Sequence, residues 1–225
     1  MSAPMTKPRT ASSPGRPPKK AAPPPADLRL RILDTAEALI EQDGLAALSM
    51  REVARRTGVT HQAPYHHFAD RETILASLVA RGFDLLTQRM RLANDRAGKL
   101  GRRAGLQAAG EAYVGFAIDH PGVFRIMFRP ELCDATRFPE AMEASLRAYD
   151  ELARLVRLMH RGEYSESLAN TYWAQVHGLA MLIVDGPIGR EVASLKGRRA
   201  RMRQSIAHFT DFAMAFEPGD EAQEH

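Results

Sequence analysis

Residues 49–68 read SMREVARRTGVTHQAPYHHF and predict two short helices joined by a tight turn. Ser49 is placed to cap the first helix, because its hydroxyl can accept from backbone N–H groups of the opening turn, and Glu52 completes a capping box. Gly58 is placed to end this helix, since glycine adopts positive φ without a Cβ clash. Thr60 would cap a second helix that runs to the end of the stretch. An apolar stripe at helical spacing supports the first helix: Met50, Val53 and Ala54.

Two helices joined by a short glycine-containing turn form the helix-turn-helix pattern, whose second helix enters the major groove of DNA. Base edges are approached closely when side chains near the start of that helix are short. The positions expected to read bases are His61, Gln62, Ala63 and Tyr65. Gln62 can pair bidentately with adenine, and Ala63 can contact a thymine methyl group. Pro64 has no backbone N–H, so we expect it to bend the start of this helix.

A further set of side chains around the two helices is expected to hold phosphates, which fixes the register of a protein on DNA without reading sequence. These residues are Ser49, Arg51, Thr60, His66, His67 and Arg71. The neighbouring Arg55 and Arg56 fit a solvated face better, with a phosphate contact as the alternative. The adjacent histidines point to different helix faces and no cysteine or paired carboxylate accompanies them, so neither a metal site nor a cofactor is expected.

The rest of the chain predicts an all-α protein with roughly nine helices, because apolar residues recur at helical spacing and no run alternates strictly. We expect these helices at about 28–43, 49–58, 60–68, 70–97, 103–119, 123–128, 139–161, 165–185 and 196–216. Residues 1–26 are rich in Pro, Ala, Ser and Lys and are predicted to be disordered, as is the acidic tail 217–225. The basic run GRPPKK at 15–20 could lie along DNA, although a solubilising tail is favoured.

Composition is ordinary for a globular protein, with 44% hydrophobic and 26% charged residues and a net charge of +4 over 225 residues. A weakly basic chain permits a polyanionic partner without requiring one. Cys133 is the only cysteine, which excludes an internal disulfide and fits a reducing compartment. No apolar run approaches the ~18 residues that span a bilayer, and no secretory signal opens the chain. A cytoplasmic location without membrane contact is therefore expected.

Three pieces of the chain resemble the tetracycline-repressor (TetR) family of bacterial transcription regulators, in order and in spacing. They read ILDTAEALIEQDG at 32–44, LSMREVARRTGVT at 48–60 and APYHHFADRETIL at 63–75. A generic helix-turn-helix would not bring the Tyr-x-His-Phe element and the capped helix after it. The run YWAQVHGLA at 172–180 resembles the Trp…His-Gly (WHG) signature of one C-terminal subclass. Many relatives carry an apolar residue such as Leu where this chain has Pro64.

The resemblance implies a three-helix DNA-binding domain over 27–88 and a helical ligand-binding and dimerisation domain over 89–216. It implies a homodimer on a palindromic operator in double-stranded DNA, released by a small effector. Because aromatic and Met side chains suit an apolar ligand, the candidate pocket residues are Tyr113, Phe116, Phe124, Met127, Phe128, Met142, Trp173, His177 and Met181. A plain core is the alternative for each of them. The candidate interface residues on the last two long helices are Leu179, Leu182, Ile183, Ile206, Phe209, Phe212 and Phe216.

The sequence therefore predicts a ligand-responsive transcriptional repressor. An activator of the same fold stays open. A non-specific DNA-binding protein that uses its N-terminal arm, and an all-α enzyme, are weaker alternatives. Against an enzyme, the chain has no Gly-x-Ser-x-Gly, no phosphate-binding loop and no metal-ligand spacing, so no catalytic residue is proposed.

Overall fold

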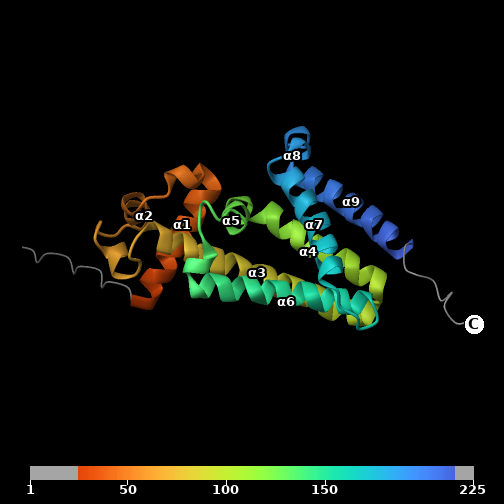
Figure 1. Ribbon diagram of the computed structural model, residues 1–225. Coiled ribbons are helices and arrows are strands. Elements are labelled where there is room, and N and C mark those ends of the chain that lie inside the picture. Colours follow the sequence, from red (N-terminus) through yellow and green to blue (C-terminus); the bar gives the residue numbers. More distant parts are fainter. Residues whose placement is uncertain (1–24, 216–225) are drawn as a thin grey trace, which may run out of the picture.

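The computed structural model describes residues 25–215, which fold into nine α-helices and three short 3-10 helices with no strand among them. The all-α prediction is confirmed. In Figure 1 the N-terminal helices lie at one end of an elongated molecule, and the last three α-helices lie towards the other. The tails expected at 1–26 and 217–225 fall outside the described residues, apart from residues 25 and 26, which begin the first helix.

The N-terminal part packs α1 (Pro25–Asp43), α2 (Met50–Thr57) and the start of α3 (Arg71–Leu100) around one core. Its fully buried side chains include Ile32, Leu39, Val53, Phe68 and Ile74. Two 3-10 helices, η1 (Leu45–Ala47) and η2 (Ala63–His66), lie in the connections. The predicted cap of α3 is confirmed, because the Asp70 carboxylate accepts from the Thr73 backbone N–H at 2.8 Å.

The long helix α3 joins the N-terminal part to the rest, and its 30 residues span roughly 45 Å. α6 (Pro139–Met159) lies beside it and runs in the same direction (Figure 1). The ion pairs along this contact show the shared direction, because residue numbers increase along both helices. Asp84 pairs with Arg147 at 2.7 Å, and Asp95 pairs with Arg154 at 2.5 Å. α4 (Arg102–Asp119) returns along α3, and Gly101 permits the reversal at a φ of 90°.

The expected break at His120-Pro121-Gly122 is confirmed, since α4 ends at Asp119 and α5 (Pro121–Met127) begins after it. The 3-10 helix η3 (Ala135–Arg137) precedes α6. α7 (Glu166–Val184) and α9 (Leu195–Ala215) both pack on α4, and a five-residue helix that the sequence did not predict, α8 (Pro187–Glu191), separates them. Within residues 25–215, no helix is both long enough and apolar enough to cross a membrane.

Candidate functional site

The first helix of the helix-turn-helix has the predicted ends. The Ser49 hydroxyl accepts from the Glu52 backbone N–H at 3.2 Å, and Gly58 ends α2 in the left-handed conformation at a φ of 74°. A side-chain cap of this kind stabilises a helix by about 1 kcal/mol. Thr57 fixes the other end, because its hydroxyl donates to the Val53 carbonyl at 2.7 Å and lies 3.1 Å from the Thr35 hydroxyl in α1.

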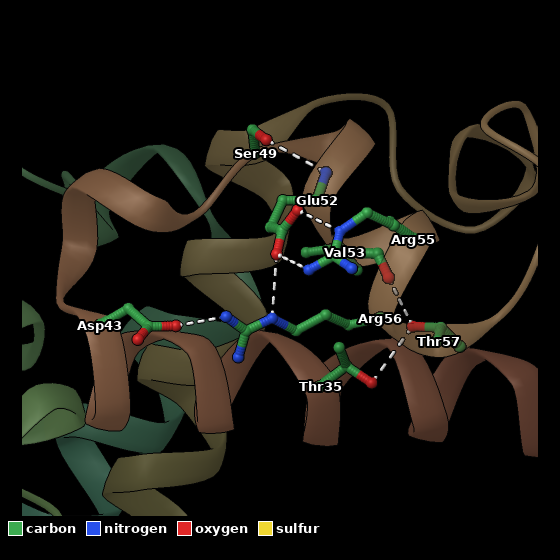
Figure 2. A network of polar contacts seen from close by, with 8 residues as sticks. All are labelled: Thr35, Asp43, Ser49, Glu52, Val53, Arg55, Arg56 and Thr57. Atoms are coloured by element: carbon green, nitrogen blue, oxygen red, sulfur yellow. Dashed lines mark hydrogen bonds and ion pairs between the residues drawn. The ribbon is translucent and has the colours of Figure 1, made fainter.

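The capping box is only half formed, which corrects the prediction for Glu52. Its carboxylate accepts from Arg55 at 2.8 and 2.6 Å and from Arg56 at 2.9 Å (Figure 2). Charge-assisted bonds to guanidinium groups are stronger than a bond to an exposed backbone N–H, which explains the choice. These bonds lower the pKa of Glu52 to about 2. Arg56 also pairs with Asp43 and so ties α2 to the end of α1.

The second helix of the motif differs from the prediction of a helix capped by Thr60 and running to Phe68. Only Ala63–His66 are helical, as the 3-10 helix η2, and Gln62 precedes it without a side-chain cap bond. Pro64 explains the change. It has no N–H to donate, and it disfavours the α conformation of the residue before it. Three hydrogen bonds accordingly step by three residues: Ala63 N to the Thr60 carbonyl, Tyr65 N to the Gln62 carbonyl and His67 N to the Pro64 carbonyl. A four-residue step follows at the end, from Phe68 N to the Pro64 carbonyl at 2.9 Å.

The structure places the candidate base-reading side chains on one segment around η2. His61 and Gln62 are exposed, and their side-chain nitrogens lie 3.1 Å apart. Tyr65 is 50% exposed, whereas Ala63 is half-buried. Pro64 between them is buried, so its ring faces the N-terminal core and holds the segment against it. The segment thus exposes His61, Gln62 and Tyr65 to solvent, while Pro64 packs inside.

The candidate phosphate contacts surround this segment, with one difference in role. Arg51, Thr60 and His66 are exposed, and His67 is half-buried. Arg71 instead donates to the carbonyls of Leu48 at 2.8 Å and Leu45 at 3.0 Å. It therefore fastens the connection between α1 and α2 to the start of α3. No spacing in the sequence indicates this role, because the acceptors are backbone carbonyls more than twenty residues away.

The C-terminal part contains a cavity of about 340 Å³ that is lined by five helices. Four of the nine candidate pocket residues line it: Tyr113, Met127, Phe128 and Trp173. The other five are not among its lining residues: Phe116, Phe124, Met142, His177 and Met181. Phe116 and Phe124 are fully buried in the core. Residues of α3 and α6 that the sequence did not single out as pocket residues complete the wall, including Phe83, Met90 and Leu152.

A polar cluster sits at one side of the cavity. The Trp173 indole N–H donates to the Tyr113 hydroxyl at 3.1 Å, and that hydroxyl lies 2.9 Å from Nδ1 of His177. His177 itself does not line the cavity. Its ring centroid lies 4.7 Å from the ring centroid of Phe128, which does. Burial raises the pKa of Tyr113 and lowers the pKa of His177, so both side chains are uncharged near neutral pH.

α5 connects the cavity to the N-terminal part. Its end supplies Met127 and Phe128 to the cavity wall. Its start is held by α1, because the Glu41 carboxylate accepts from the backbone N–H groups of Gly122 at 2.8 Å and Val123 at 3.0 Å. Sequence reasoning missed Glu41, since a glutamate near a helix end reads as a solvated residue until its distant partner is known.

The candidate interface residues divide into two groups. Leu179, Ile183 and Ile206 are buried within the protomer, and Phe209 is half-buried against the Tyr172 ring. Leu182 and Phe212 are 44% and 62% exposed. Phe216 lies outside the described residues. Of the predicted interface residues within the described part of the chain, Leu182 on α7 and Phe212 on α9 therefore expose the most apolar surface.

Two family models match the chain in the regions just described. "Bacterial regulatory proteins, tetR family" matches residues 32–78, and "Tetracyclin repressor-like, C-terminal domain" matches residues 106–204. An uncharacterised HTH-type transcriptional regulator from Haemophilus influenzae is 26% identical over 199 residues, which cover 85% of this chain and 94% of that protein.

Solved structures share the fold over most of their length. A protein of unknown function from Rhodococcus sp. RHA1 superposes with a TM-score of 0.69 at 27% identity, covering 89% of this chain and 98% of that one. The TetR family transcriptional regulator PfmR from Thermus thermophilus gives a TM-score of 0.61 at 19% identity, over 82% of this chain and 97% of its own.

Proposed function

This chain belongs to the TetR family of DNA-binding transcriptional regulators, and we propose that it is a homodimeric repressor that a small molecule releases from a palindromic operator. The observation that carries the proposal is the double attachment of α5. One end of this helix lines the cavity and the other is hydrogen-bonded to Glu41 in α1. A ligand that moves Met127 or Phe128 would therefore act on α1, which packs against α2 of the helix-turn-helix.

In this proposal the segment around η2 enters the major groove. Gln62 pairs with one base and Ala63 touches a thymine methyl group, while His61 and Tyr65 contact neighbouring base edges. Arg51, Ser49, Thr60, His66 and His67 hold the flanking phosphates. Arg71 contributes by keeping the motif in shape, since its guanidinium is engaged by two carbonyls.

Dimerisation supplies the second half-site. A single short reading segment covers few base pairs, and two-fold operators call for two-fold proteins. We place the interface on α7 and α9, where Leu182 and Phe212 are exposed within the protomer. The domain division follows from this assignment: residues 27–88 bind DNA, and residues 89–216 bind the effector and the partner subunit. The WHG-like run at 172–180 falls in the same region and supplies Trp173 to the cavity.

Release follows if the effector favours a different position of the two reading segments. The free energy that couples two such sites is typically about 1–3 kcal/mol, which corresponds to a change of roughly 5–150-fold in operator affinity. The effector must therefore prefer the DNA-free form by that factor.

Footprinting on the DNA that flanks its own coding region tests the proposal. We expect the protein to protect a two-fold site on this DNA. In a separate reporter assay, removal of the protein should increase transcription. Gln62→Ala should relax the preference at one base pair in each half-site by about 1–3 kcal/mol. A chain that lacks residues 1–26 should keep the same footprint. Uniform, sequence-independent protection would refute the proposal, and loss of transcription on removal would identify an activator.

A further inference from the structure

The cavity has a largely apolar wall without a side chain that is charged at neutral pH. Among the described residues, none of its lining side chains is Asp, Glu, Lys, Arg or His. The wall consists of aliphatic and aromatic side chains such as Leu86, Met90, Leu106 and Phe128, and of three tyrosines, one serine and one tryptophan. A charge placed inside would lose its hydration and gain no partner of opposite charge, which is very costly in free energy.

The wall hydroxyls other than that of Tyr113 each make a hydrogen bond within the protein. The Ser145 hydroxyl donates to the Met142 carbonyl at 2.7 Å, and the Tyr149 hydroxyl lies 2.9 Å from that of Tyr164. The Tyr172 hydroxyl lies 3.3 Å from Nε2 of His160. The wall therefore offers a ligand few polar groups, each of which already makes a hydrogen bond within the protein.

Tyr113 is the most buried of the three wall tyrosines, and one of its hydrogen-bonding positions stays open. A phenol oxygen can donate once and accept twice. Trp173 uses one acceptor position, and the contact with His177 uses a second position. If Tyr113 donates to His177, one lone pair stays open, and if His177 donates to Tyr113, the phenol proton stays open. An alcohol can donate and accept, so it matches either arrangement.

We propose that the cavity takes an uncharged, largely hydrocarbon molecule with a single hydroxyl or comparable neutral group, which meets the Tyr113 hydroxyl. The inference rests on the proposed function only in treating this cavity as the effector site. The cavity volume of about 340 Å³ equals roughly eleven water molecules at ~30 Å³ each, which suits a molecule on the order of ten heavy atoms.

The chain carries its own reporter for the test. Trp173 is the only tryptophan among the 225 residues, and it lines the cavity. We would titrate the full chain with 1-octanol, octanoate and octylammonium near neutral pH and follow Trp173 fluorescence. The three probes share one hydrocarbon chain and differ in the charge of the head group. We expect saturable binding of 1-octanol at least about ten times tighter than that of either ion.

Equal or tighter binding of octanoate would overturn the proposal, because a carboxylate would then be accommodated as well as a neutral hydroxyl. Binding of none of the probes would overturn it too. Neither result involves DNA, so the footprint tests the proposed repressor function independently of these titrations.

Two variants locate the bound molecule. Ala148→Phe adds a ring to the wall and should abolish binding of 1-octanol and of toluene, while the far-UV spectrum and the footprint stay as in the wild type. Tyr113→Phe keeps the ring but removes the hydroxyl, and should weaken 1-octanol several-fold while toluene still binds. Unchanged affinity for 1-octanol in Tyr113→Phe would overturn the role of that hydroxyl. The comparison of the three wild-type titrations remains decisive if a variant does not fold.

Discussion

Glu41 and Gly122 bring α1 and α5 into direct contact. The Glu41 carboxylate accepts from the Gly122 N–H at 2.8 Å, and a Cβ built at Gly122 would lie 3.0 Å from Cδ of Glu41 and 2.7 Å from Cγ2 of Ile40. The two helices approach this closely because residue 122 has no side chain. The carboxylate also neutralises the partial positive charge at the start of α5. Displacement of α5 therefore changes the position of α1 or breaks these bonds.

The first prediction concerns this contact. Glu41→Ala should lower the free energy of unfolding by about 1 kcal/mol, since two N–H groups at a helix start lose their acceptor. Operator affinity without ligand should change by less than about two-fold, because Glu41 lies away from the reading segment. The factor by which a cavity ligand weakens operator binding should fall. Urea unfolding and operator titrations with and without ligand measure the three quantities.

Glu41→Gln serves as the matched control, because the amide keeps an acceptor oxygen and the size of the side chain. It should retain most of the ligand response. If Glu41→Ala responds to ligand as strongly as the wild type, the contact between α1 and α5 does not transmit the signal.

The second prediction separates two arginines that both flank the reading segment. Arg51→Ala should weaken operator binding and reduce its dependence on the logarithm of salt concentration by about one unit, with an unchanged melting temperature. Arg71→Lys should lower the melting temperature and operator affinity together, because lysine cannot reach two carbonyls as a fork, and should leave the salt dependence unchanged. The reverse pattern would make Arg71 the phosphate contact.

The third prediction concerns Pro64. Pro64→Ala restores a backbone N–H and relieves the restriction on Ala63, so the segment 60–68 can move from a 3-10 helix towards an α-helix. We expect the preferred bases to change at the positions read by Gln62 and Tyr65, with little change in salt dependence. Selection of operator variants by both proteins measures this. Identical base preferences would show that η2 adopts the same conformation on DNA with either residue.

The helices themselves were predictable because their signals are local. Ser49, Gly58 and Asp70 act on backbone groups within a few residues, and each was placed correctly at a helix end. The exceptions had a stronger competitor nearby: Glu52 binds two guanidinium groups instead of a backbone N–H, and Pro64 converts the expected helix to a 3-10 turn.

The candidate sites were predictable only in part, since they depend on which side of a helix faces which neighbour. Aromatic content indicated a pocket, but it could not separate Phe128, which lines the cavity, from Phe124, which is fully buried four residues earlier. Ile206 satisfied the pattern of an interface residue and instead fills the space opposite Gly110, where a Cβ would lie 2.9 Å from its Cδ1. Such choices depend on contacts between helices that are distant in sequence.

The fourth prediction concerns the pH dependence of stability through His177. Burial lowers the pKa of His177 below its ordinary value of 6.5. As pH falls below that value, the unfolded chain binds a proton at this position and the folded chain does not. Unfolding then takes up a proton, and the folded state loses stability until pH reaches the lowered pKa. His177→Gln, which keeps a polar group beside Tyr113, does not titrate.

The stability of the wild type relative to His177→Gln should therefore decrease as pH is lowered from about 7.5 to about 5.5. Urea unfolding of both proteins at several pH values measures this difference. The other seven of the eight histidines are common to both chains, so their titration cancels. A relative stability of the wild type that rises as pH falls would mean that the folded state stabilises protonated His177, contrary to its position behind the apolar cavity wall.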